Sequence, residues 1–139
     1  MYSPESKLDI IVFPEMAFTG YNFTSIEDAL PHAVAAGEGK EFEFASQIAA
    51  SINSYVAFGY IEKSQEGGET VLYNSAAIID RSGKMILNYR KSHLYFNDQL
   101  WAKEGKEFLH FDLITTEGKS IRCTLGICMD INPKNFVSQ

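Results

Sequence analysis

Three apolar segments of this chain each run into a residue with a charged or reactive side chain. These residues are Glu15, Lys91 and Cys128. Short continuous apolar runs are typical of strands that are covered on both faces. The pattern therefore predicts a buried sheet whose strands end at a carboxylate, an ammonium and a thiol.

The rest of the chain predicts an alternation of strands and helices. Apolar residues recur at helical spacing over residues 40–53, and a second helix is expected over 25–36. Turn residues such as Gly67-Gly68 and Ser82-Gly83 separate the later apolar runs. The expected strands cover residues 8–13, 55–61, 71–80, 84–90, 108–113 and 120–127. This order favours an α/β fold with a mixed sheet, followed by a short helix from Pro133.

Length and charge narrow the class of protein. The 139 residues suffice for one compact domain, and no boundary or linker divides them. A net charge of −6 argues against binding nucleic acid through a broad basic face. The apolar runs are too short to cross a membrane, and no secretion signal is visible at the N-terminus.

The cysteines and histidines argue against a disulfide and against a metal. Cys123 and Cys128 lie five positions apart on one expected strand, so they point to opposite faces and cannot easily bridge. Two such thiols indicate a reducing compartment, and we expect the cytoplasm. No CxxC pair occurs, and His32, His93 and His110 are scattered.

One carboxylate, one ammonium and one thiol suffice to hydrolyse an amide. A thiol attacks carbonyl carbon as its thiolate, and an adjacent carboxylate can remove the proton. An ammonium and a backbone N–H can stabilise the oxyanion that forms. The same carboxylate can protonate the leaving ammonia and then activate water. This chemistry needs neither a metal nor another cofactor.

Three motifs resemble those of the nitrilase superfamily of carbon–nitrogen hydrolases, in the order and at about the spacing that the family shows. The resemblance implies that Glu15 is the general base, Lys91 stabilises the oxyanion and Cys128 is the nucleophile. It also implies that the N–H of Met129 contributes to the oxyanion site. The motifs read IVFPEMAFTGY (11–21), NYRKSHLY (88–95) and TLGICMDINP (124–133).

The residues around these motifs look most like the fungal-type protein N-terminal amidases. The segments LYNSA, NYRK and GICMDINP are the basis for this resemblance. It implies deamidation of N-terminal Asn and Gln in proteins, feeding an N-degron pathway. Two alternatives stay open: a small-molecule amidase of the ω-amidase or carbamoylase type, and a catalytically inert truncated fragment.

The family resemblance also implies a fold and its extent. Nitrilase domains form a four-layer α-β-β-α sandwich of roughly twice this length. The similarity covers nearly all of this chain but only about the first half of such a domain. We therefore expect residues 1–139 to form a single partial domain, and relatives commonly form homo-oligomers.

Other residues are weaker candidates for the site. Family members tend to have a second glutamate after the lysine motif, and we favour Glu104, with Asp98 as the alternative. Tyr21 and Asn22 either line the pocket or belong only to a turn at Gly20-Tyr-Asn. Asp130 either binds a substrate ammonium or caps the turn after the nucleophile.

Four further residues have structural interpretations. Arg90 should point away from Lys91 and form a structural ion pair. His93 is favoured as structural rather than as a partner of the thiol, and Cys123 as part of a strand core. Trp101 is either a pocket wall or part of the core.

Overall fold

A mixed sheet of four strands lies at the centre of the fold. The computed structural model describes residues 7–132. The strand order is β1-β2-β3-β4, with β1 parallel to β2 and the other pairs antiparallel, and β5 and β6 form a separate hairpin. The elements are β1 (Ile10–Val12), α1 (Ile26–Ala29), η1 (Leu30–His32), α2 (Lys40–Ile52), β2 (Tyr55–Glu66), β3 (Glu69–Ile79), β4 (Met85–Arg90), η2 (Asp98–Leu100), β5 (His110–Ile114), β6 (Ser120–Thr124) and η3 (Cys128–Ile131).

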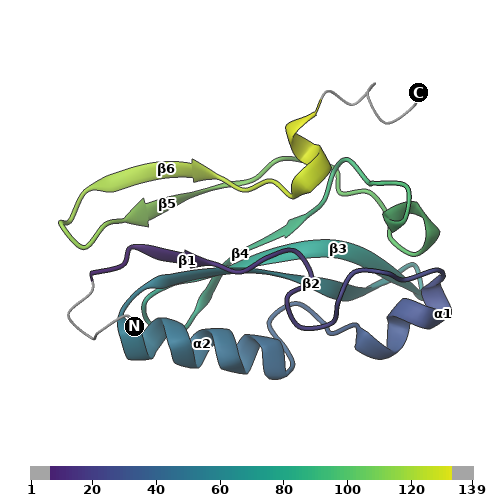
Figure 1. The fold of residues 1–139 in the computed structure, drawn as a ribbon, viewed down its shortest axis with the longest axis horizontal. Coiled ribbons are helices and arrows are strands. Elements are labelled where there is room, and N and C mark those ends of the chain that lie inside the picture. Colours follow the sequence, from purple (N-terminus) through teal and green to yellow (C-terminus); the bar gives the residue numbers. More distant parts are fainter. Residues whose placement is uncertain (1–6, 133–139) are drawn as a thin grey trace.

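Three layers are visible in Figure 1: helix α2, the four-stranded sheet, and the β5–β6 hairpin on the opposite side of the sheet. Phe42 and Ala49 of α2 pack against Phe58 of β2. On the other face, Phe111 of β5 packs against Ala57 of β2. The strands β2 and β3 are therefore covered on both faces, which explains why they read as near-continuous apolar runs. The expected α/β class with a mixed sheet is confirmed.

The hairpins agree with the sequence, although their lengths differ. The Gly67-Gly68 turn joins β2 to β3, and both glycines have a positive φ. We expected the first strand of this hairpin to stop at residue 61, but β2 continues to Glu66. The prediction was too short because Glu62, which reads as a polar strand end, is buried and hydrogen-bonded within the sheet.

Other boundaries also differ from the prediction, among them those of β3, expected over 71–80, and of β5, expected over 108–113. The helix predicted over 25–36 is a single turn, α1, followed by the 3-10 turn η1, because Pro31 cannot donate a helical hydrogen bond. Strand β1 is half as long as its apolar run. Strand β6 ends at Thr124, so Cys128 does not follow directly on a paired strand. The helix expected from Pro133 lies outside the described residues.

Candidate active site

Glu15 lies on the turn that follows β1, pressed against the neighbouring strand. Phe13 N–H donates to the carbonyl of Ala57 at 2.8 Å, which aligns the end of β1 with β2. A Cβ on Gly59 of β2 would meet the Cα of Glu15 at 3.0 Å. The glycine therefore leaves room for the turn to approach β2 closely. Met16, next in the chain, adopts a φ of 55° to complete this turn.

Lys91 follows β4 and is fully buried. Its Nζ lies 2.8 Å from Oε1 of Glu15 and 2.6 Å from Oδ2 of Asp98. Burial by itself would lower the pKa of Lys91, but the hydrogen bonds and charges of Asp98 and Glu15 outweigh it and raise the pKa. The side chain is therefore a permanent ammonium held between two carboxylates.

Two buried polar residues complete the surroundings of this ion pair. Asn74 of β3 donates its Nδ2 to Oε1 of Glu15 at 2.7 Å. Asp98 also accepts the N–H of Tyr95 at 3.0 Å, which holds η2 close to Lys91. From the sequence, Asp98 was only the alternative to Glu104 as the second carboxylate, and Asn74 was not predicted. A polar residue within the apolar run of β3 was the available signal for Asn74.

Cys128 opens the 3-10 turn η3 and has a φ of 45°. This left-handed conformation is uncommon for a residue with a Cβ, and it marks the turn as constrained by its surroundings. The thiol is exposed and free. By contrast, Cys123 is partly buried and packs against the core beneath the hairpin, in agreement with the structural interpretation.

Glu15 and Cys128 line the same cavity, which has a volume of about 400 Å³. Lys91 contacts Glu15 without lining the cavity itself, so the structure brings the three predicted residues together. The other residues that line this cavity are Pro14, Tyr21, Tyr95 and Met129. The cavity thus combines a thiol and a carboxylate with a wall of aromatic and apolar groups.

Tyr21 was expected in the pocket, and the structure places it there. Burial raises the pKa of Tyr21, and the negative charges of Asp98 and Glu15 raise it further. The hydroxyl therefore stays protonated and can act as a hydrogen-bond donor. Asn22, predicted beside it, is exposed and does not line this cavity.

Asp130 accepts hydrogen bonds from four protein donors and does not line the cavity that contains Glu15. Trp101 is buried in a core cluster with Met16 and Phe23, which resolves the question left open by the sequence. The His93 ring packs edge-on against Phe108.

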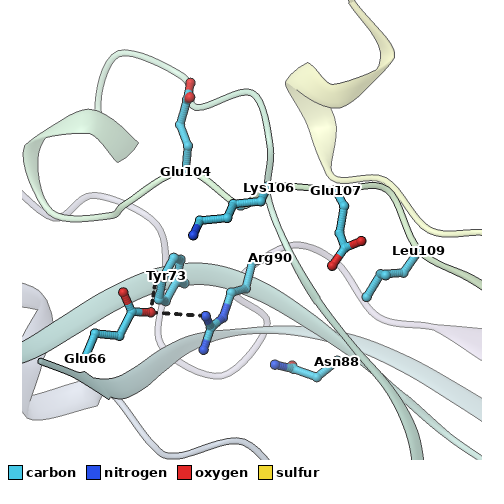
Figure 2. A pocket seen from close by; sticks show the side chains of 9 residues that line it. Glu66, Tyr73, Asn88, Arg90, Glu104, Lys106, Glu107 and Leu109 are labelled. Carbon is cyan, nitrogen blue, oxygen red and sulfur yellow. Dashed lines mark hydrogen bonds and ion pairs between the residues drawn. The ribbon is translucent and has the colours of Figure 1, made fainter.

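Glu104 does not line the cavity that contains Glu15 and Cys128. It lines a second cavity of about 380 Å³ on the face where Arg90 stacks over the Tyr73 ring. Figure 2 shows the Glu104 carboxylate pointing away from Tyr73 and Arg90. Arg90 itself pairs with the buried Glu62 at 2.5 Å, as the structural interpretation predicted. The two carboxylates that contact Lys91 are those of Glu15 and Asp98.

The described residues contain neither a candidate metal site nor a helix that could span a membrane. Within residues 7–132, no group of three or more His, Cys, Asp or Glu side chains is arranged to hold a metal ion. Among the same residues, no helix has the length and apolar character needed to cross a membrane.

The comparisons with known proteins agree with this geometry. A family model described as carbon-nitrogen hydrolase matches residues 3–137. The chain belongs to the carbon–nitrogen hydrolase family. It is 35% identical to the protein N-terminal amidase of Saccharomyces cerevisiae over 95% of its own length. It is also 35% identical to the protein N-terminal amidase of Schizosaccharomyces pombe over 91% of its length.

Solved structures of this family show the same arrangement of the backbone. A crystal structure of an N-terminal amidase with an Asn-Glu-Ala peptide superimposes on 92% of the chain with a TM-score of 0.74 and 36% identity. A carbon–nitrogen hydrolase from Xanthomonas campestris shares the fold at 20% identity, with a TM-score of 0.70. The chain spans 31% and 44% of the two yeast amidases and 33% of the peptide-bound structure.

Proposed function

We propose that this chain contributes the catalytic residues of an amidohydrolase that deamidates N-terminal Asn or Gln of proteins. The main observation in support is the shared cavity of Glu15 and Cys128, with the Lys91 ammonium 2.8 Å from the Glu15 carboxylate. The similarity to N-terminal amidases supports the choice of substrate.

In the first proposed step, Glu15 removes the Cys128 proton and the thiolate attacks the carbon of the side-chain amide. The C–O double bond becomes an oxyanion, which Lys91 and the backbone N–H of Met129 stabilise. Glu15 then gives its proton to the amide nitrogen. The C–N bond breaks, ammonia leaves, and a thioester to Cys128 remains.

In the second step, Glu15 removes a proton from water, and the hydroxide attacks the thioester carbonyl. The C–S bond breaks, the thiolate recovers the proton from Glu15, and the product is a carboxylic acid. Asparagine becomes aspartate and glutamine becomes glutamate. The fixed ammonium of Lys91 suits both steps, because each passes through an oxyanion at the same position.

Peptide complexes of similar proteins support a substrate with a side-chain amide. N-terminal amidases have been solved with peptides beginning with Asn and with Gln, at 36% identity to this chain. Both cysteines are free, which supports a reducing compartment such as the cytoplasm. Glu104 stays a prediction for the second carboxylate and Asn22 for substrate contact. Assembly of the whole protein into a homo-oligomer is likewise a proposal.

The direct test measures ammonia release by the full-length protein from peptides that begin with Asn or Gln. Cys128→Ala and Glu15→Gln should abolish release, because one removes the nucleophile and the other the base. Cys123→Ala is the matched control and should retain activity, since Cys123 does not line the cavity. Activity in Cys128→Ala would exclude the proposed mechanism.

The same assay separates the alternatives. Free ω-amides or carbamoyl amino acids that react faster than Asn-peptides would favour a small-molecule amidase. If the full-length protein hydrolyses an amide of the panel and residues 1–139 alone do not, the alternative of a catalytically inert truncated fragment holds.

A further inference from the structure

The Asp130 carboxylate is saturated by donors from within the protein. Its Oδ1 accepts the backbone N–H of Ser92 at 3.1 Å and of His93 at 2.8 Å. Its Oδ2 accepts the Tyr89 hydroxyl at 2.7 Å and the N–H of Ile127 at 2.9 Å. A carboxylate offers about four lone-pair sites, and all of them are used. Asp130 is half-buried and lines a neighbouring cavity with Cys128, but donors of its own chain occupy these sites and leave none for a substrate ammonium.

These four donors come from two separate parts of the chain. Tyr89, Ser92 and His93 flank Lys91, on the segment that leaves β4. Ile127 directly precedes Cys128. One carboxylate thus joins the turn that contains the thiol to the turn that contains the ammonium, 37 positions earlier in the sequence.

This connection has no substitute among the described residues. Within residues 126–132, every hydrogen bond to a more distant part of the chain has Asp130 as its acceptor. Ile127 also packs against Ala76 and Tyr89, but apolar contact is non-directional and does not fix the orientation of the turn. The orientation of the Cys128 turn relative to Lys91 therefore depends on Asp130.

Asp130 also closes the turn around the strained residue. Its backbone N–H donates to the Ile127 carbonyl at 3.0 Å, while its side chain accepts the Ile127 N–H. Both peptide groups of Ile127 are thereby fixed, and Cys128 lies between these anchors with a φ of 45°. Strained conformations of this kind persist only where surrounding contacts overdetermine them.

We propose that Asp130 is a positioning residue, which holds the Cys128 sulfur in the orientation required for attack by tying its turn to the Lys91 segment. This inference rests on the proposed function for its catalytic consequence. It assigns no contact between Asp130 and substrate. It also explains how the unpaired segment between β6 and η3 can hold the Cys128 thiol in a fixed position.

The test compares Asp130→Asn with Tyr89→Phe in the full-length protein, well below the melting temperature. Asn keeps the size of Asp but replaces one acceptor oxygen with an NH₂ group, which faces two N–H or O–H donors. Loss of hydrogen bonds to a charged group predicts a kcat about 10- to 100-fold lower for Asp130→Asn, with KM within about twofold. Tyr89→Phe removes one donor of four and should lower kcat by about three- to tenfold.

Tyr60→Phe is the matched control. It deletes a buried hydroxyl that bonds Asn88 on the opposite face of the sheet, so kcat and KM should match the unmodified protein. Equal losses of kcat in Tyr60→Phe and Tyr89→Phe would mean that general stability, and not position, explains the effect. That result would overturn the proposal.

Alkylation by iodoacetamide at neutral pH tests position without any substrate. Cys128 should react more slowly in Asp130→Asn, while Cys123 reacts at its unmodified rate. Faster reaction of both thiols would indicate local unfolding and would contradict a positioning role. Unchanged kcat and unchanged alkylation in Asp130→Asn overturn this inference alone, whereas activity in Cys128→Ala removes the proposed function.

Discussion

The side-chain amide of Asn74 donates to Oε1 of Glu15 at 2.7 Å, across 59 positions of sequence. The same oxygen accepts the Lys91 ammonium at 2.8 Å. Oε1 is therefore held by two donors, which orients the other oxygen, Oε2, for proton transfer. Asn74 fixes the rotation of the carboxylate in a way that the ammonium alone does not.

Replacing Asn74 should therefore impair the base without removing it. We expect Asn74→Ala to lower kcat about 10- to 100-fold, the range for a lost hydrogen bond to a charged group. Steady-state kinetics with an Asn-peptide measures this effect. Asn88→Ala is the control, because Asn88 on β4 donates to Glu62 on the other face of the sheet. Equal effects on kcat would contradict the orientation argument.

The buried pair of Lys91 and Asp98 should dominate the stability of the site. Both side chains are fully buried, and removal of Asp98 leaves the buried Lys91 charge with Glu15 as its remaining carboxylate. Asp98→Asn should destabilise the protein by about 3 kcal/mol and lower the pKa of Lys91. Urea unfolding measures the loss.

The exposed pair of Asp112 and Arg122 provides the control for this prediction. Asp112→Asn should leave the unfolding curve unchanged, because water already screens that pair. Similar losses of stability in both variants would show that burial of the Lys91 pair has no special effect.

The sequence predicts the scaffold and the reacting groups better than the groups that hold them. Apolar runs and glycine turns define the hairpins, and the motif residues define Glu15, Lys91 and Cys128. The contacts of Asn74 and Asp98 arise only when β1, β3 and η2 come together in space. A polar residue in an apolar run marks Asn74, but no local pattern identifies its partner, and the same is true of the four donors to Asp130.

The misplaced boundaries have a similar origin. Residues 125–127 read as a strand, but only Leu125 makes a cross-strand bond, at 3.4 Å to Leu109. The segment is apolar because Ile127 packs against Ala76 and Tyr89, not because it pairs. A short apolar run can therefore arise from burial alone, without the pairing of a strand.

Gly105 is a site where any side chain should disrupt the structure. A Cβ at this position would lie 2.1 Å from the carbonyl oxygen of Arg90. The backbone N–H of Gly105 donates to the carbonyl of Lys91 at 2.8 Å. Gly105→Ala should force this loop away from Lys91 and destabilise the protein by about 1–3 kcal/mol. Thermal unfolding with an activity assay tests both effects.

Gly126→Ala is the control for this glycine. A Cβ at this position would lie 3.5 Å from the Cβ of Asp130, which is ordinary van der Waals contact. The variant should therefore unfold near the temperature of the unmodified protein. A Gly105→Ala protein as stable as Gly126→Ala would contradict the close approach to Arg90.

Glu66 should give the protein part of its sensitivity to acid. A hydrogen bond from Tyr73, followed by that from Lys103, lowers the pKa of Glu66 from 4.5 to about 2. A pKa that is lower in the folded state favours folding above pH 4.5, and this contribution is lost as the pH falls towards 2. Glu66→Gln should therefore be less stable than the unmodified protein at a pH of about 6, and the difference should shrink at a pH of about 2.5.

Urea unfolding at both pH values measures this difference in stability, with Glu117→Gln, at an exposed glutamate, as control. A difference that grows in acid would mean that the carboxylate of Glu66 opposes folding, contrary to its contacts with Tyr73 and Lys103.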